Sequence, residues 1–121
     1  MSGKQRRAGR ISVQANGEIF DAKGSFSYNL GRDKREGLVG SDGVHGYKET
    51  PQIPFIEGEI TDSKELDLDS LLTMEDATIT LRLAVGKTIM LRDAWYSDEG
   101  TAESEEGKIP FRFEGMNAEE I

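Results

Sequence analysis

The residues that could carry out chemistry in this sequence are few, and none of them completes a catalytic pattern. Gly86-Lys87-Thr88 has the residue types that end a phosphate-binding P-loop. That motif needs a glycine five positions before Gly86, where Leu81 stands, and a hairpin turn surrounds the lysine where a helix should begin. His45 has no serine, cysteine or second histidine arranged around it as a nucleophile pattern requires. We therefore expect no nucleotide site, and a turn or interface role for His45.

The acidic residues also match no catalytic or metal motif. Glu57 and Glu59 share one face of a predicted strand, where paired carboxylates can do acid–base work. On a half-exposed strand, however, such neighbours are more typical of a solvated surface. Asp62, Asp67 and Asp69 do not have the spacing of a calcium loop. A chain with no cysteine and one histidine also offers no usual zinc or haem ligand set. We predict a protein that is not an enzyme and needs no cofactor or metal.

Length and charge set the limits within which these residues must be positioned. The 121 residues predict one domain, residues 1–121, and no apolar run is long enough to cross a membrane. The formal net charge is −8, but residues 1–48 carry nine basic and five acidic side chains, and residues 49–121 carry six and eighteen. Three interpretations stay open: a solvated surface with a loose basic tail, a polarised molecule whose copies attract end to end, or a basic arm for nucleic acid. The acidic excess weakens the third interpretation.

Alternating apolar residues predict a mainly β fold. Asn16-Gly17 after an alternating run is a strong hairpin signal, and further turns are expected near Lys23-Gly24 and Val85-Gly86-Lys87. One short helix is predicted at residues 67–74, where leucines recur at helical spacing. The sequence thus predicts a small antiparallel β-sandwich or barrel of six or seven strands, at residues 10–15, 18–22, 25–30, 53–62, 77–84, 88–96 and 108–114.

Residues 31–52 do not fit this alternating pattern. Five glycines punctuate a charged stretch that has few sizeable apolar residues. A loop of this length is uncommon in a compact domain and is usually functional or disordered. It holds too little apolar surface to pack on its own domain, so we expect a partner to supply the missing contacts.

An ordered series of short motifs in this sequence resembles the tail tube protein of Mu-like contractile-tailed bacteriophages. The resemblance covers roughly residues 9–116, and it is the order of the motifs, more than any one of them, that is specific. The motifs are Gly43-Val-His-Gly-Tyr47, Glu49-Thr-Pro51, Pro54-Phe-Ile-Glu-Gly58, Ile60-Thr-Asp62, Ala77-Thr-Ile-Thr-Leu81, Gly86-Lys-Thr88, Ala94-Trp95 and Phe111-Arg-Phe-Glu-Gly115.

This resemblance implies a structural virion protein with the antiparallel β-sandwich or barrel of the phage tail tube type. Such proteins form hexameric rings that stack head to tail into a hollow tube inside a contractile sheath, and the genome leaves through the lumen. The implied partners are other copies of the chain, the sheath protein, and the tape measure, baseplate and tail-terminator proteins, with DNA only in transit. The tube would be assembled in the bacterial host cytoplasm and would reside in the virion tail.

Within this family, three groups of residues become candidate surfaces. A polar strand face is expected to line the lumen, as a net negative wall that repels DNA phosphates. The candidate contacts of the long loop, residues 31–52, with an adjacent subunit or ring are Arg32, Lys34, Arg35, Glu36, His45 and Tyr47. The lumen-facing candidates are Ser25, Ser27, Asn29, Glu57, Glu59, Thr61, Thr78, Thr80 and Arg82. The outer, sheath-facing candidates are Asp98, Glu99, Glu103, Glu105 and Glu106.

Two segments lie outside these groups: a basic N-terminal extension at residues 1–9 and a C-terminal tail at residues 116–121. The main alternative from another functional class is a monomeric β-barrel module that binds a small ligand or peptide. Sedimentation distinguishes the two, because only the binding module stays monomeric at high concentration.

Overall fold

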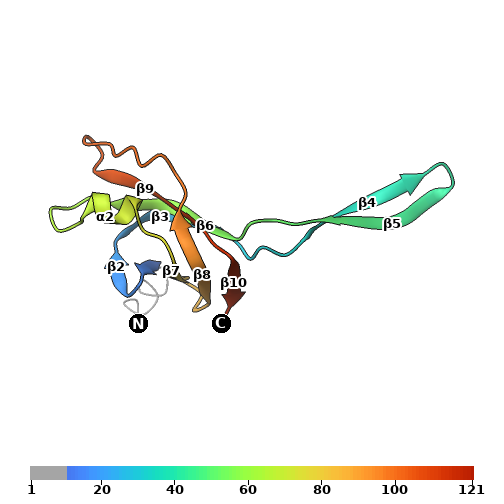
Figure 1. The fold of residues 1–121 in the computed structure, drawn as a ribbon, viewed down its shortest axis with the longest axis horizontal. Helices are drawn as coiled ribbons and strands as arrows, with labels where there is room; N and C mark the ends of the chain where they lie inside the picture. The colour runs from blue at the N-terminus through green and yellow to red at the C-terminus, as the bar shows by residue number, and fades with distance from the viewer. Residues whose placement is uncertain (1–10) are drawn as a thin grey trace, which may run out of the picture.

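The computed structural model describes residues 11–121 as a β-rich body from which one long hairpin projects (Figure 1). The predicted N-terminal extension, residues 1–9, lies outside the described residues. The described elements are β1 (Ser12–Ala15), β2 (Glu18–Phe20), β3 (Ala22–Asn29), β4 (Lys34–Gly40), β5 (Gly43–Thr50), β6 (Phe55–Thr61), α2 (Leu68–Leu72), β7 (Ala77–Arg82), β8 (Thr88–Tyr96), β9 (Lys108–Glu114) and β10 (Asn117–Glu120).

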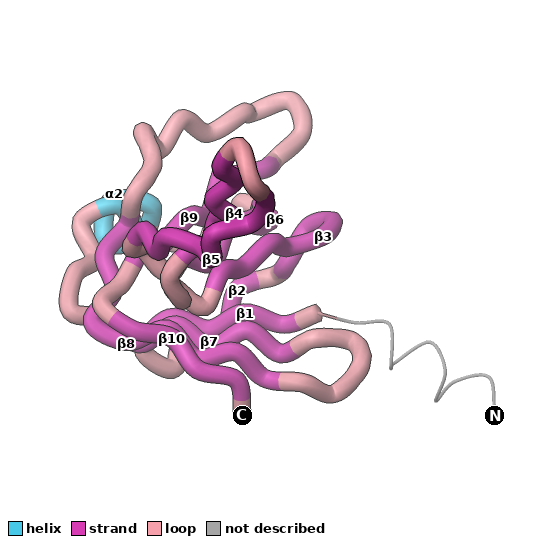
Figure 2. Tube along the Cα trace, turned by 90° about the vertical axis from the view of Figure 1, so that its right-hand side faces the viewer, coloured by secondary structure: helices cyan, strands magenta, loops and turns pink. Residues whose placement is uncertain are grey.

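The body is a sandwich of two antiparallel layers. Its strands follow the order β2-β1-β7-β8-β9-β6-β3, and β10 pairs with β8 beside this path. Figure 2 separates the layers: β1, β7, β8 and β10 lie in one, and β3, β6 and β9 lie in the other. We call these the β7 layer and the β6 layer. The predicted mainly β, antiparallel fold is confirmed.

Strand β8 joins the two layers. Its first part pairs with β7 and β10, whereas Trp95 and Tyr96 at its end pair with Glu114 and Phe113 of β9. Between these parts Asp93 has a φ of 52°, and the register against β7 shifts. A bulge of this kind bends a strand and increases its twist. It therefore carries the strand from one layer into the other.

The core lies between the layers and is filled by the alternate residues of each strand. Ile79 and Leu81 of β7 face Ile56, Phe111 and other apolar residues of the β6 layer in one buried cluster. Phe111 is central, with ring centroids of Phe20 and Phe26 each 5.9 Å away and that of Phe113 at 4.9 Å. No polar or charged side chain is buried within residues 11–121. Because the core lies between the two layers, their outward faces point in opposite directions.

Local signals in the sequence place most elements correctly. Asn16 and Gly17 both have positive φ, at 53° and 87°, as the predicted hairpin turn requires. The helix α2 lies within the predicted range 67–74, and Asp67 caps it by accepting a hydrogen bond of 3.1 Å from the Ser70 amide. Near the predicted turn at Lys23-Gly24 the chain changes direction inside β3: Gly24 has a φ of 79°, and the register against β6 shifts between Lys23 and Ser27.

Two further segments differ from the sequence-based expectation. Residues 116–121, predicted as a C-terminal tail, include a strand: Asn117–Glu120 forms β10, and its Ala118 is only 4% exposed against β8. Residues 31–52 are not a loop: they hold the paired strands β4 and β5. In both cases the strand is stabilised by its pairing partner, and the alternation of apolar residues did not predict it. No helix within residues 11–121 is long and apolar enough to span a membrane.

Candidate assembly surfaces

The hairpin of β4 and β5, called the arm below, is the most prominent feature of the surface. Figure 1 shows it continuing the direction of β3 and β6 away from the body. Its strands pair from Lys34 opposite Thr50 to Gly40 opposite Gly43, so Ser41 and Asp42 form a two-residue turn. Every residue of both strands is exposed except Gly40, which is intermediate. The arm contributes no residue to the core cluster.

Ion pairs between the strands explain how the arm keeps its shape without a core. Arg35 Nε lies 3.2 Å from Glu49 Oε2, and its guanidinium is 5.0 Å from the ring centroid of Tyr47. On the other face Glu36 lies 3.7 Å from Lys48 and 4.0 Å from Lys34. These exposed pairs each contribute little, about 0.2–1 kcal/mol, but together they oppose splaying of the two strands.

The outer half of the arm is apolar on one face. The alternation and pairing of the strands place Val39, Val44 and Tyr47 on the same face. Val39 and Val44 are each 79% exposed, and Tyr47 is 55% exposed. On the opposite face, the exposed His45 ring lies against Gly40, 2.4 Å from the position that a Cβ atom would take there. The arm thus offers apolar side chains that its own body leaves uncovered.

The structure brings most of the predicted loop residues together on the arm. Lys34, Arg35 and Glu36 lie on β4, and His45 and Tyr47 on β5, where His45 Nε2 is 2.7 Å from Asp42 Oδ1. The sixth, Arg32, lies before the arm and accepts a hydrogen bond from Gln52 through its carbonyl. Sequence reasoning missed Val39 and Val44 as contact residues, although they are among the few sizeable apolar residues of this segment.

The nine lumen candidates do not share one surface. The outward face of the β6 layer carries six of them, with Ser27 paired to Glu57 and Asn29 paired to Phe55. The other three, Thr78, Thr80 and Arg82, lie on the outward face of the β7 layer, because Ile79 and Leu81 between them are buried. Since these faces point in opposite directions, one subunit cannot present all nine residues to the same lumen. The six on the β6 layer are Ser25, Ser27, Asn29, Glu57, Glu59 and Thr61.

Basic residues of β9 pair with the two predicted glutamates of that face. Arg112 bonds Glu57 and also Glu114, the latter at 2.9 Å. Arg112 therefore offsets part of the negative charge expected at this face, and a net negative wall stays a prediction. The alternation of β9 could have revealed the partners, because its buried residues 109, 111 and 113 leave 108 and 112 facing outward.

A second ion-pair cluster continues along the same face. Lys108 Nζ lies 3.3 Å from Glu59 and 2.9 Å from Glu106. Hydrogen bonds to these two carboxylates raise the pKa of Lys108, and the bond to Lys108 lowers the pKa of Glu106. Lys23 reaches the same corner and donates a 2.7 Å hydrogen bond to the Glu106 carbonyl. The β6 face is thus charged but nearly balanced.

The five predicted outer residues all lie on the segment between β8 and β9. This segment packs on α2, because a Cβ atom at Gly100 would lie 2.5 Å from the Leu72 side chain. Glu106 joins the ion pairs of the β6 face, and Asp98 borders a hollow on that face together with Ser27 and Glu57. Glu103 contacts Lys108 through backbone hydrogen bonds. Within residues 11–121 no three acidic or histidine side chains gather as a metal site.

Comparisons with known proteins agree with this geometry. A family model described as phage tail tube protein matches residues 4–120. No curated protein sequence matches the chain significantly. Among solved structures, the anti-feeding prophage cap, a tube-terminating cap, has a TM-score of 0.63 and 12% identity, covering 93% of this chain and 88% of that one.

Two further structures come from an extracellular contractile injection system in the extended state. Its sheath/tube terminator aligns with a TM-score of 0.63 and 13% identity over 93% of each chain. Its sheath–tube complex aligns with a TM-score of 0.62 and 12% identity over 93% of this chain and 88% of that one. At these identities the likeness establishes a shared fold.

Proposed function

This chain belongs to the phage tail tube protein family, and we propose that it forms hexameric rings that stack head to tail as the inner tube of a contractile tail. Its tail tube role is structural, in agreement with the prediction that it is not an enzyme. The proposed tube serves as a conduit for genome ejection. Membership of the Mu-like group stays a prediction.

The observation that carries the proposal is the combination of an uncovered arm with open sheet edges. Within residues 11–121, β2, β3 and β10 each have a strand neighbour on one side only. Exposed edges of this kind tend to pair with another chain. A closed ring satisfies such edges between neighbouring subunits, and an arm that reaches the next ring makes a heterologous contact that repeats without end. The open edges and the arm together support the proposal of a stacked tube.

We propose that the outward face of the β6 layer lines the lumen. Its serines and ion-paired side chains present a hydrated surface on which neither sign of charge dominates, so DNA phosphates gain little by binding there. Thr78, Thr80 and Arg82 then lie on the side of the subunit away from the lumen. Of the predicted outer residues, we propose Glu99, Glu103 and Glu105, together with α2, as contacts for the sheath protein, because Asp98 and Glu106 lie at the β6 face.

The wider setting follows the same proposal. The tube would be built in the bacterial host cytoplasm, would end as a component of the virion tail, and would meet tape measure, baseplate and tail-terminator proteins. The similar solved structures are themselves named as tube, sheath–tube and terminator components of contractile particles, which supports sheath and terminator partners for this chain.

Electron microscopy of the purified protein tests the proposal directly. We expect hollow tubes from the natural chain. A variant in which Asn-Gly replaces residues 37–47 joins Glu36 to Lys48, which are already register partners, through a favoured two-residue turn. It should fold with an unchanged melting temperature, because the arm adds nothing to the core, and should form no tubes. Normal tubes from this variant would refute the role of the arm.

Cysteine labelling tests which face lines the lumen, since the natural chain has no cysteine. Ser27→Cys and Thr78→Cys form a matched pair, because both positions are exposed and lie on opposite outward faces. In free subunits a bulky maleimide should label both. In assembled tubes it should label Thr78→Cys and leave Ser27→Cys protected, and the reverse pattern would contradict the assignment.

A further inference from the structure

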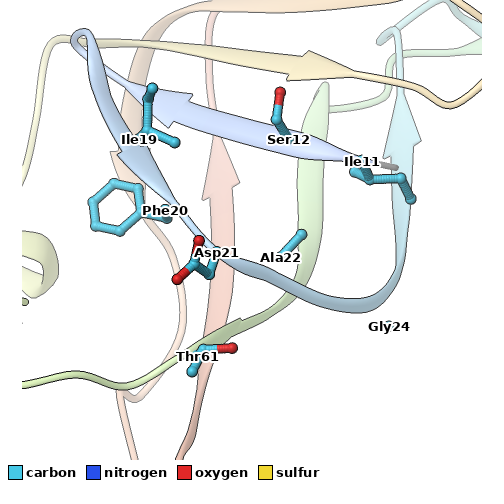
Figure 3. Close-up of a pocket in the computed structure, with 8 residues that line it drawn as sticks. All are labelled: Ile11, Ser12, Ile19, Phe20, Asp21, Ala22, Gly24 and Thr61. Atoms are coloured by element: carbon cyan, nitrogen blue, oxygen red, sulfur yellow. The ribbon is translucent and has the colours of Figure 1, made fainter. Parts of the chain in front are cut away.

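A groove opens on the surface of the body. It has a volume of about 620 Å³ and lies between the β1–β2 hairpin and the first part of β3 (Figure 3). Ile11, Ile19, Phe20 and Ala22 supply its apolar lining. Ile19, which alternates with the buried Phe20, is 66% exposed and adds to this apolar lining. A smaller hollow continues from it past Phe20 toward Leu66.

The groove marks the place where the sheet of the body fails to close. The strand order begins with β2 and ends with β3, and these strands are joined only by Asp21. Within the described residues the two strands do not pair with each other, so each has one free edge facing the groove. Unpaired backbone groups and exposed apolar side chains together favour an added strand or hairpin at this site.

The arm needs a binding site that encloses it. At about 3.4 Å per residue its strands are roughly 24 Å long, and two strands are about 10 Å wide, so one face offers only about 240 Å². A stable interface buries about 800 Å² on each partner. Contact with a flat surface falls well short of that area, whereas a groove that covers both faces and the edges of the inserted part buries several times as much of it.

The groove and the arm lie at opposite ends of the subunit. Strand β3 runs from Ala22 beside the groove to Asn29, and the arm begins at Lys34 and continues in the same direction (Figure 1). At 3.3–3.4 Å per residue, and with two residues of β3 taken up by its bulge, the arm tip lies at most about 55 Å from Ala22. A second copy displaced along β3 by roughly 40 to 50 Å therefore receives the outer half of the arm in its own groove.

We infer that the arm of one subunit inserts its outer half, with Val39, Val44 and Tyr47, into the groove between β2 and β3 of a second copy in the next ring. This inference rests on the proposed stacking of rings and adds the surface that receives the arm. Each subunit then both donates an arm and accepts one, so the contact propagates along the tube.

Disulfide trapping tests the contact. In tubes of the variant carrying Val44→Cys and Ile19→Cys, oxidation should link successive subunits into a ladder on a denaturing gel. The matched control carries Val44→Cys and Ile53→Cys, because Ile53 is 55% exposed but follows the arm at its base. The control should give no ladder. The inference would be overturned if the first variant formed normal tubes without a ladder, or if both variants gave equal ladders. In either case the tube itself would be established.

A second variant keeps the test decisive if the cysteines interfere with assembly. Ile19→Asp places a charge at an exposed position, so the monomer should keep its melting temperature within about 1 °C, while the charge opposes insertion of the apolar arm. Stacked tubes should be lost or at least tenfold fewer. Full-length tubes from this variant would overturn the inference.

A disulfide between Ile19→Cys and Gln5→Cys within one subunit of the tube would instead assign the groove to the N-terminal segment, and would overturn the inference as well.

Discussion

Gly58 offers a stringent test of the packing beneath the proposed lumen face. It faces inward from β6 opposite Phe111, and the ring of Phe26 covers it. A Cβ atom added at Gly58 would lie 2.6 Å from the Phe26 ring, whereas carbon atoms prefer about 3.5 to 4.0 Å. The ring would have to move by about 1 Å in a core where Phe26 already packs on Phe111. We therefore predict that Gly58→Ala destabilises the protein.

The magnitude follows from two opposing effects. Overpacking a core costs about 1 to 3 kcal/mol, and replacing glycine in a strand returns about 0.5 to 1 kcal/mol through the lower entropy of the unfolded chain. The expected net loss is about 1 to 2 kcal/mol. For a domain of this size that loss lowers the melting temperature by about 4 to 8 °C, which calorimetry or circular dichroism measures readily.

Two controls separate steric overlap from other effects of the substitution. Gly37→Ala on the arm has no atom within 4 Å of the added Cβ, so it should not lower the melting temperature. Combining Gly58→Ala with Phe26→Leu should cost about 1 kcal/mol less than the sum of the single changes, because the smaller side chain makes room. A melting temperature for Gly58→Ala within 1 °C of the natural protein, or strict additivity of the double variant, would refute the reasoning.

Three further predictions concern other parts of the body. Burial raises the pKa of Tyr96 to about 12, so the folded state keeps this proton after the unfolded chain releases it near pH 10. Stability should therefore fall as the pH rises from about 10 to 12. Thermal melts of Tyr96→Phe across that range should show a smaller fall. Ala118→Asp buries a charge against β8 and should cost about 2 kcal/mol or more, while Met116→Asp, 69% exposed, should cost nothing measurable in the same melts. Asp67→Ala removes the N-cap of α2 and should cost about 1 kcal/mol in chemical unfolding, and an unchanged midpoint would show that the cap is dispensable.

Local sequence patterns were sufficient to predict most of the body. The alternation of Ile79 and Leu81 specifies a strand with one buried face, and it does so without knowledge of the partner strand. Asn16-Gly17 specifies a turn because few other residue pairs tolerate positive φ at both positions. Asp67 and the leucines after it specify a short helix. Each of these signals depends only on a residue and its near neighbours.

Strand β10 and the arm, which local patterns did not predict, are held by pairing: β10 with a distant strand, and the two strands of the arm with each other. Strand β10 shows weak alternation, and it is ordered because Ala118 packs on β8 while Arg92 bonds Glu119. The arm lacks a core altogether, and its order comes from cross-strand pairs such as Arg35 with Glu49. Such pairs become visible only when the register is known, because a shift by one residue would exchange the two faces.

The sequence by itself determined that this protein is a mainly antiparallel β structure with no complete catalytic motif, and its ordered motifs indicated the tail tube family. Those conclusions rest on spacing along the chain, which folding does not alter. Only the tertiary structure decided how the predicted lumen-facing residues divide between two opposite faces. The bend of β8 at Asp93 folds the strands into two opposed layers. The tertiary structure also decided that Glu57 and Glu59 face Arg112 and Lys108, and that the arm and the unclosed edge of the sheet lie at opposite ends of the subunit.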